Sequence, residues 1–584
     1  MSLQALRAAS SLHDVASLVG FSPSALAYIV YKKPTLNKYK SFDIPKRGGG
    51  LRTIKAPVPE LKLLQKNLSV LLQNCIEEIN TKRGFADTLA HGFKRKRSII
   101  SNADRHRKRG YVFNIDLEDF FGTINFGRVR GFFIKDANFM LAPPVATLLA
   151  QIACHENALP QGSPCSPVIS NLIGHILDIR LSRLAAREGC VYSRYADDIS
   201  FSTNKPTFPP GIARQIAGDA HKWESGAKLQ KLIAGAGFAI NPTKTRMQYR
   251  GSRQSVTGLL VNKKVNIRSE YRRTVRAMAQ RLFMRGEFEY ESTVIGANGA
   301  STAGKVKGHI EQLHGMFGHI DLVDRHNEEQ ESKFDSGSKP AKKDARDRLY
   351  SKQAIYRRFL IFKDFYSVKR PVVVCEGKTD NIYLRHALKS LGPAYPKLAS
   401  VAANNKVELK IRILKTLGSC VGRVLGLGRG YSSLNGLIEE YVKELKKFKA
   451  PGMEHPVILL ADNDDGGEGV LKVVTGITKV TGSNADPFVY VMGTCIWCSL
   501  RCRREKRNLR SKISSMTTLR TSSWVERNSM PTKRQIRICI FRNLSWQNMS
   551  EKMRRGSTSL DSRPFSIGLR RLSMITIPNW VRQR

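Results

Sequence analysis

The chain has 584 residues, of which 97 are Lys or Arg and 48 are Asp or Glu, so its formal net charge is +49. A hydrophobic content of 41% is enough to bury cores, which excludes wholesale disorder, and no apolar run is long enough to predict a membrane span. The positive charge favours a polyanionic partner, with nucleic acid the default. Ten irregularly spaced cysteines and the lack of a visible secretory signal predict a cytoplasmic protein.

Helical and strand-like patterns divide the chain into four parts. In chain order they predict short helices over 1–40, two strands around a Gly-rich turn in 41–57, a helix from Glu60 to Asn80, alternating strands and helices over 111–262, a loop over 286–308 and a helix from Ile310 to Val323. These elements make up a first part, 1–325. Residues 326–365 begin with a polar, charged stretch and are the predicted linker. Strands and helices alternate again over 366–492, which predicts a second α/β domain, and 493–584 form an arginine-rich tail.

Three aspartates lie in two strand-like runs of the first part. The run Tyr111–Ile115 ends in Asp116, and Asp197 and Asp198 stand inside the run Tyr195–Phe201. Adjacent aspartates inside a strand are costly unless they face water or a cation. A tight hairpin would set them beside Asp116, where the three carboxylates suit two divalent cations about 4 Å apart. The alternative from the residues alone is a turn with two solvated aspartates.

The first part also holds groups suited to a nucleoside triphosphate. Gln161 and Gly162 lie in a proline-rich loop, Leu159–Pro167, where the glycine lets a nucleotide approach the backbone closely. Arg52 offers a cation to phosphate oxygens, and Lys244 is a candidate partner for pyrophosphate.

Together these motifs resemble reverse transcriptases. The Tyr-x-Asp-Asp box at 195–198, the Asp116 strand and the Leu-Pro-Gln-Gly-Ser-Pro loop stand in the order of that family. The resemblance implies an α+β right-hand fold of fingers, palm and thumb over 1–325, with dNTPs as substrates and two Mg²⁺ held by Asp116, Asp197 and Asp198. Phe121 resembles the bulky gate that crowds a ribose 2′-OH, with core packing as the alternative. The nucleotide-binding residues that the resemblance implies are Arg52, Phe121, Gln161, Gly162 and Lys244.

Two shorter elements resemble the retron branch of this family. Residues 102–106 match an Asn-Ala-x-x-His element, and residues 256–258 match a Val-Thr-Gly element. A retron enzyme is expected to bind a cognate structured non-coding RNA and to start DNA synthesis from a guanosine 2′-OH in it, which gives branched RNA-linked single-stranded DNA (msDNA). A basic helical stretch near 272–281 suits RNA phosphates, with a solvated face as the alternative. The predicted RNA-binding residues are Asn102, His106, Val256, Thr257, Gly258, Arg272, Arg273 and Arg276.

A second set of acidic residues follows two apolar strands of the second domain. Glu376 ends the run Val372–Cys375, and Asp462 and Asp464 follow a run that starts at Val457. Carboxylates at the carboxyl ends of parallel strands converge at one crevice, where one Glu and two Asp suit Mg²⁺ or Mn²⁺. The pair of motifs resembles the TOPRIM domain of topoisomerases, primases and related nucleases, a Rossmann-like α/β fold, and retron reverse transcriptases with a fused C-terminal TOPRIM domain are a known subtype. The resemblance implies that these three carboxylates hold the metal.

The arginine-rich tail breaks the pattern of this second domain after residue 492. When its codons are read with the last base of one and the first two of the next, a valine is forced across Trp497 and Cys498, because Trp is TGG and Cys begins with TG. An aspartate is likewise forced across Met516 and Thr517, in a stretch where the resemblance requires acidic residues. We therefore hypothesise that residues from about 493 to 584 are translated out of frame, so that the TOPRIM-like domain is truncated. Resequencing of the gene tests this.

The sequence thus predicts a retron reverse transcriptase with a TOPRIM effector domain, and the family implies a role in anti-phage defence. Its expected partners are the cognate RNA, the msDNA and dNTPs, with no membrane, and self-association is left open. Two alternatives remain at this point. A group II intron-like maturase gives no reason for the element at 102–106, and an inactive RNA-binding scaffold gives no reason for three intact aspartates.

Overall fold

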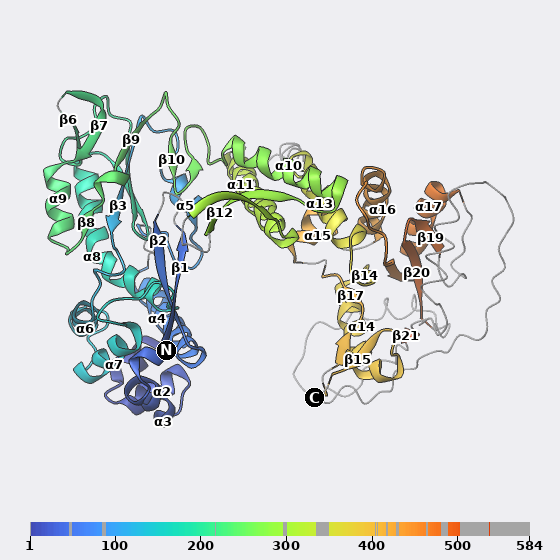
Figure 1. Ribbon diagram of the computed structural model, residues 1–584, viewed down its shortest axis with the longest axis horizontal. Coiled ribbons are helices and arrows are strands. Elements are labelled where there is room, and N and C mark those ends of the chain that lie inside the picture. Colours follow the sequence, from blue (N-terminus) through green and yellow to red (C-terminus); the bar gives the residue numbers. More distant parts are fainter. Residues whose placement is uncertain are drawn as a thin grey trace, which may run out of the picture. The chain divides into compact units, whose positions relative to one another are not determined.

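The computed structural model describes residues 2–45, 50–84, 89–216, 218–295, 301–334, 350–402, 404–405, 407–415, 418–427, 431–462, 465–479, 489–502 and 536–537. The chain divides into two compact units, each with its own sheet (Figure 1). The first unit comprises Met1–Arg273, Glu291–Val306 and His319–Lys342, and the second comprises Thr274–Tyr290, Lys307–Gly318 and Lys343–Arg584. Among the described residues no single helix is long and apolar enough to cross a membrane, although one sharply bent pair of short helices near residues 12–32 passes on length and composition.

The first unit begins with short helices that pack on one long helix. The elements are α1 (Ser2–Ala8), α2 (Leu12–Val19), α3 (Pro23–Ala27), η1 (Tyr28–Lys32), η2 (Thr35–Asn37) and α4 (Pro59–Arg83). Helix α4 begins with a proline at its first position and ends at Gly84, whose φ of 69° no longer fits a right-handed helix. Leu61, Leu64, Leu68 and Leu72 are buried on one face, as the spacing of three and four residues requires. The predicted helix is confirmed.

A two-stranded hairpin precedes α4. Strands β1 (Tyr39–Pro45) and β2 (Leu51–Pro57) pair antiparallel, with Ile44 opposite Arg52. The two strands predicted over 41–57 are therefore confirmed. Most of their side chains are exposed, so Arg52 stands on an open ribbon.

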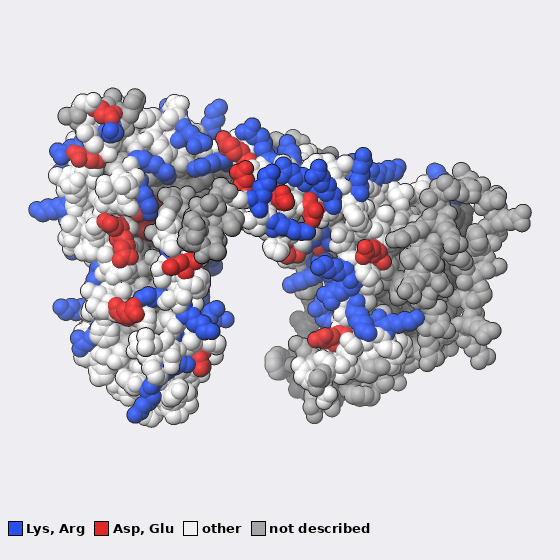
Figure 2. Space-filling model, in the orientation of Figure 1, with Lys and Arg blue, Asp and Glu red and all other residues white. Residues whose placement is uncertain are grey.

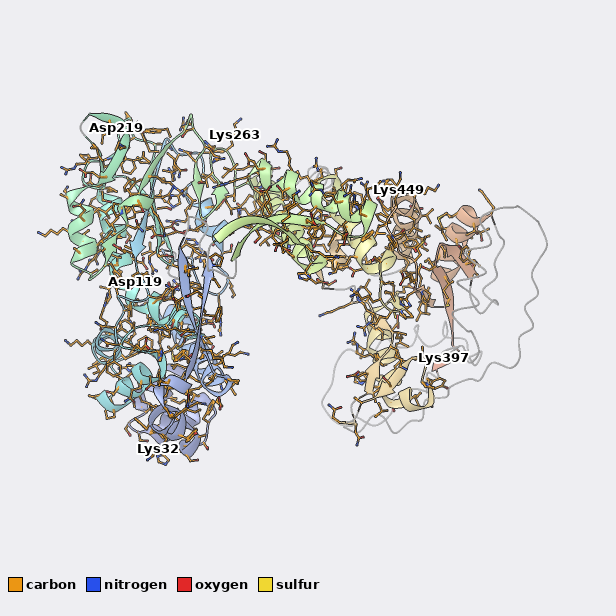
Figure 3. All side chains as sticks on the ribbon, in the orientation of Figure 1. Lys32, Asp119, Asp219, Lys263, Lys397 and Lys449 are labelled. Carbon is orange, nitrogen blue, oxygen red and sulfur yellow. The ribbon has the colours of Figure 1, made fainter. Side chains whose placement is uncertain are left out.

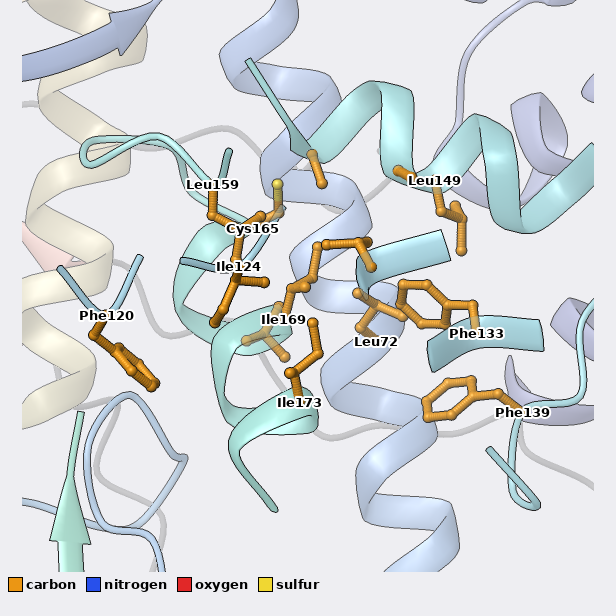
Figure 4. Close-up of a cluster of buried hydrophobic side chains, with 14 of the residues drawn as sticks. Leu72, Phe120, Ile124, Phe133, Phe139, Leu149, Leu159, Cys165, Ile169 and Ile173 are labelled. Carbon is orange, nitrogen blue, oxygen red and sulfur yellow. The ribbon is translucent and has the colours of Figure 1, made fainter. Parts of the chain in front are cut away.

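The central sheet of the first unit is antiparallel and has the strand order β4-β5-β3-β8, with β9 also paired to β3. Its strands are β3 (Tyr111–Glu118), β4 (Val191–Tyr195), β5 (Asp198–Thr203), β8 (Ala239–Ile240) and β9 (Arg246–Tyr249). Strands β6 (Ala213–Ile216) and β7 (Asp219–Ser225) form a separate hairpin. The helices of this region are α6 (Phe126–Lys135), α7 (Pro143–Ala153), α8 (Ser166–Arg187), α9 (Ala227–Ala234) and the short η3 (Pro242–Lys244). Phe133, Phe139 and Ile169 pack together in its core (Figure 4).

A smaller core in the first unit joins segments that are distant in sequence. Helix α5 (Ile99–Asp104) and the hairpin of β10 (Ser255–Val256) and β11 (Leu259–Leu260) share it with Val323 of α11 (Ile310–Phe334). The predicted helix from Ile310 is confirmed and runs longer than predicted.

The elements that follow the central sheet include one correction. Helix α10 (Ser269–Arg285) is followed by strands β12 (Glu289–Ile295) and β13 (Ser301–Lys307), which pair in a two-stranded sheet. The loop predicted over 286–308 is therefore wrong. Phe288 and Tyr290 alternate with Glu287 and Glu289, a strand pattern that the surrounding glycines obscured.

The second unit contains a mixed sheet of order β17-β14-β18-β20-β19. Strands β14 (Val372–Cys375), β17 (Arg412–Ile413), β18 (Val457–Asp462) and β20 (Cys495–Cys502) pair in parallel, and β19 (Val489–Met492) pairs antiparallel with β20. Strands β15 (Ala399–Val401) and β16 (Val407–Leu409) form a hairpin, and β21 (Ile536–Arg537) pairs with β20. The remaining elements are α13 (Ala354–Ile361), η4 (Phe362–Tyr366), α14 (Lys378–Leu391), η5 (Gly392–Ala394), α15 (Cys420–Val424), α16 (Tyr431–Leu445) and α17 (Asp465–Thr478). Parallel strands alternating with helices are what the predicted α/β domain requires.

The predicted linker needs a correction at both of its ends. Residues 326–334 belong to α11, in which Asn327 and Glu328 are buried. Residues 354–365 are helical and bury Tyr356 and Phe359 against Phe317. Polar composition suggested a linker here, but these side chains are fixed by packing. The sheet also continues past residue 492 into β20, and apart from β21 the rest of the tail, 503–584, lies outside the described residues.

Candidate active site

A hairpin and its neighbouring strand bring the three aspartates of the first unit together. Strands β4 and β5 pair so that Tyr195 lies opposite Asp198, which leaves Ala196 and Asp197 as the turn. Ala196 has a φ of 57°, the left-handed backbone that such two-residue turns require. In the next pairing Asp116 of β3 lies opposite Asp198. The predicted hairpin is confirmed, and it sets the carboxylates at the same end of three strands.

Lys244 supplies a positive charge to this group. Its Nζ lies 2.9 Å from both carboxylate oxygens of Asp116. The lysine ends the short helix η3, whose first turn is held by Asn241, and the Asn241 backbone N–H donates to the Asp116 carbonyl at 2.8 Å. The side chain predicted to meet pyrophosphate therefore contacts a predicted metal ligand directly.

Asp197 and Asp198 lie where negative charge is disfavoured. Partial desolvation raises the pKa of Asp198 to about 6, with further contributions from the charges of Asp197 and Asp116, although Asp198 keeps contact with solvent. Burial raises the pKa of Asp197 too, and Lys244 and Arg52 oppose that rise. Among the residues that the structure describes, no three acidic, His or Cys side chains stand ready as a metal cluster. The donor set nevertheless fits a divalent cation, because gathered carboxylates gain most from a strong positive charge.

A buried ion pair supports the turn between β4 and β5, and sequence reasoning missed it. Arg194, fully buried, donates to both carboxylate oxygens of Asp178 on α8, at 2.7 Å each. Its third bond, of 3.0 Å, goes to the carbonyl of Ala196 inside the turn. Tyr192 also donates to Asp178, at 2.6 Å. A lone arginine in an otherwise uncharged strand was the available signal, since such a residue needs a buried partner.

The predicted nucleotide loop packs against the hairpin that carries Arg52. The Lys55 backbone N–H donates to the Gln161 carbonyl at 2.8 Å. Gly162 has a φ of 120°, and a Cβ there would stand 2.7 Å from the Lys55 carbonyl, so only glycine fits. Ser163 is tied to α4 through Gln65, at 2.8 Å.

The chain turns sharply after β3 and presents Phe121. Asp119, labelled in Figure 3, has a φ of 38°, and Thr123 N–H donates to its carbonyl at 2.9 Å. Phe121 is half-buried and packs on Phe120, with ring centroids 5.5 Å apart. Phe121 thus packs against the core and keeps part of its ring exposed, so its role as a gate stays a prediction.

The prediction that Asn102 and His106 contact RNA is corrected, because both side chains lie inside the protein. His106 is fully buried, and its two ring nitrogens contact the hydroxyls of Ser202 (2.7 Å) and Ser193 (2.8 Å). Ser193 in turn donates to Asn102 at 2.7 Å. Burial lowers the pKa of His106 to about 3, so the ring is neutral. These residues brace β4 and β5 beneath the active-site hairpin.

The element at 256–258 is the tip of the β10–β11 hairpin. Val256 is fully buried, so its side chain does not reach RNA as predicted. Thr257 and Gly258 have φ values of 46° and 82°, as a two-residue hairpin turn requires. The Thr257 hydroxyl donates to the Ile99 carbonyl at 3.2 Å, which links this turn to α5.

The predicted basic helix is confirmed as α10, but its arginines differ in whether they are paired within the protein or exposed. Arg272 forms two bonds with Asp324, of 2.6 and 2.9 Å, so its charge is already paired within the protein, and its contact with RNA stays a prediction. Arg273 and Arg276 are exposed. On the face shown in Figure 2, Lys and Arg side chains gather over this region.

The second acidic set is described only in part. Glu376 follows β14, and its backbone N–H donates to the Leu460 carbonyl of β18 at 2.9 Å. Asp462 ends β18, while Asp464 lies outside the described residues. The parallel strands bring the backbone of the first two residues to one edge of the sheet. Their role as metal ligands stays a prediction.

Comparisons with known proteins agree with the site in the first unit. Residues 44–267 match the family model described as reverse transcriptase (RNA-dependent DNA polymerase). The retron Ec86 reverse transcriptase of Escherichia coli is 30% identical over 285 residues, which are 48% of this chain and 81% of that protein. The chain belongs to the retron reverse transcriptase family.

Two further members of this family come from Myxococcus xanthus. The retron Mx162 reverse transcriptase is 35% identical and the retron Mx65 reverse transcriptase 34% identical, over 43% and 45% of this chain. The chain spans 53% and 61% of their lengths. A solved telomerase structure from Candida albicans, in complex with a fragment of telomeric RNA, covers 55% of this chain and 63% of that one, with a TM-score of 0.31 and 10% identity. A likeness at that level adds nothing to the assignment.

Proposed function

We propose that the protein is the RNA-directed DNA polymerase of a retron. It copies a cognate structured RNA, from a guanosine 2′-OH and with dNTPs, into branched msDNA in the cytoplasm. The observation that carries this is the strand pairing that places Asp116 opposite Asp198, with Asp197 in the turn between β4 and β5. Family membership favours this function over a group II intron maturase.

The cofactor that fits the carboxylates is Mg²⁺, held by Asp116, Asp197 and Asp198. Two such ions would activate the attacking hydroxyl and stabilise the leaving pyrophosphate. The chain's own residues do the rest. Arg52, on the exposed β1–β2 hairpin, binds the triphosphate. The Gln161–Gly162 loop, which packs against β2, supports the nucleotide. Lys244, whose Nζ contacts the Asp116 carboxylate, is the cation that we propose for the leaving pyrophosphate, and its position beside that carboxylate supports this.

A second activity is proposed for the second unit, namely metal-dependent cleavage of phosphodiesters by a TOPRIM domain. Its support is the parallel pairing of β14 and β18, which brings Glu376 and Asp462 to the carboxyl edge of one sheet. The biological role that we propose for it is anti-phage defence, with the RNA–DNA product restraining the effector.

Coexpression tests the first proposal. The full chain is expressed with the non-coding region upstream of its gene, and small nucleic acids are examined before and after RNase treatment. The expected product is a branched DNA that shortens with RNase. The paired control is the double variant Asp197→Asn/Asp198→Asn, which keeps the shape of the side chains. No such product from the wild type overturns the proposal and would favour an inactive RNA-binding scaffold, whereas an equal amount from the variant contradicts the assignment of these aspartates as metal ligands.

A further inference from the structure

An exposed aromatic side chain stands beside the active-site hairpin, and no motif assigned it a role. Phe93 lies in the loop before α5 and is 44% exposed. Its φ is 57°, in the left-handed region. A bulky residue adopts that region only where the surrounding structure holds it there, and such positions gather at functional sites.

The backbone below Phe93 is fastened to the hairpin turn. The side-chain amide of Asn171, on α8, donates to the Gly92 carbonyl at 2.7 Å. Gly92 itself lies against the turn, because a Cβ there would stand 2.6 Å from the Ala196 nitrogen. The strained backbone is therefore held by the same turn that carries Asp197.

The Phe93 ring faces two other aromatic rings of the site. Its centroid is 6.3 Å from that of Phe121 and 6.5 Å from that of Tyr195. Phe121 also packs on Phe120, with centroids 5.5 Å apart. The half-buried Phe121 ring thus has one buried and one exposed aromatic neighbour.

We propose that Phe93 determines sugar specificity by holding the Phe121 ring where it excludes a 2′-hydroxyl. This inference rests on the proposed function, because a sugar gate has meaning only in a nucleotide polymerase. A ring rejects a small group only if it cannot turn away, and Phe93 is an exposed aromatic neighbour within reach of the Phe121 ring, on a backbone that is itself fastened to the turn. Discrimination by the shape of an apolar pocket is worth roughly tenfold to two-hundredfold, so the loss of this support is measurable.

The test compares dNTP with rNTP incorporation by the full chain on an RNA template with an annealed DNA primer. The variants are Phe93→Ala and Phe93→Tyr, with Tyr28→Ala as the control, since Tyr28 is a 57% exposed aromatic residue of the N-terminal helices. We expect Phe93→Ala to lower the ratio of dNTP to rNTP kcat/KM by roughly tenfold, mainly through better use of rNTPs. Phe93→Tyr and Tyr28→Ala are expected to keep the ratio of the wild type.

An equal loss of dNTP and rNTP use in Phe93→Ala, with the ratio unchanged, overturns the inference and leaves the proposed function standing. A wild type that incorporates no dNTP overturns both. A double-mutant cycle with Phe121→Ala tests the route of the effect. If Phe93 acts through Phe121, its removal changes the ratio little once Phe121 is gone, whereas full additivity contradicts that route.

Discussion

The largest sheet of each unit carries acidic residues at strand ends, but the two sheets position them by different means. In the first unit, antiparallel strands and a two-residue turn set Asp116 opposite Asp198, and a buried ion pair grips the turn. In the second unit, parallel strands bring Glu376 and Asp462 to one edge through backbone pairing. In the first unit side chains hold the turn as well as backbone pairing, whereas the contacts described at the second edge are those of the paired backbone.

The largest expected effect comes from removing two carboxylates of the first site. Asp197→Asn/Asp198→Asn removes two negative charges that would hold Mg²⁺, so DNA synthesis should fall roughly a thousandfold or more, since the metal contributes several kcal/mol to the barrier. Primer extension with saturating dNTPs measures this. Circular dichroism of the variant should match the wild type, and DNA synthesis within about tenfold of the wild type would contradict the metal assignment.

The second prediction concerns the buried ion pair that supports the turn. Asp178→Asn leaves Arg194 charged and buried without its partner, so the free energy of unfolding should fall by about 3–5 kcal/mol. Urea denaturation followed by circular dichroism measures this. The matched control is Arg214→Ala, which breaks the exposed pair with Glu224 and should cost less than about 1 kcal/mol. Equal losses in the two variants would show that burial of the pair is unimportant.

The third prediction is a pH dependence caused by His106. The folded state holds this ring neutral down to a pKa of about 3, whereas an unfolded histidine takes up its proton near pH 6.5. Between these values the unfolded state binds more protons, so His106 makes stability fall as the pH falls, by about 1.4 kcal/mol per unit. The contribution is complete above about pH 6.5. The free energy of unfolding, measured from pH 7 to pH 4, should depend less steeply on pH in His106→Gln than in the wild type, and an unchanged slope would contradict the prediction.

The smallest expected effect tests whether the two sites act independently. Glu376→Gln alters only the second sheet, so primer extension should change by less than about twofold, within the range of most surface substitutions. Any metal-dependent DNA cleavage by the chain should be lost in the same variant. A large loss of DNA synthesis would mean that the two sites do not act independently.

Local patterns were enough to predict much of the first unit. An apolar run ending in Asp116 and a Tyr-x-Asp-Asp turn indicated the hairpin, and leucines spaced three and four apart indicated α4. The parallel strands of the second unit followed from apolar runs that alternate with helical ones. These features depend on neighbours that are close in sequence, so the sequence shows them directly.

Other features depend on partners that are distant in sequence. Asn102 and His106 were predicted to contact RNA, but both are buried and bonded to Ser193, and His106 also to Ser202, on strands about 90 residues later in the chain. Arg272 looked like a phosphate ligand, yet its partner Asp324 follows 52 residues later. Polarity alone does not show whether such a residue meets solvent or a buried partner. Only the tertiary fold decides this.

The bond between Thr257 and the Ile99 carbonyl joins segments 158 residues apart, and both segments share a core with Val323 of α11. This small core has a consequence for building chimaeric enzymes. Grafting α5 from one relative without its β10–β11 hairpin would pack together side chains that come from two different cores. We therefore expect three segments to be compatible only as a set: the segment around α5, the β10–β11 hairpin and the part of α11 that packs on them. A chimaera should take all three from the same relative.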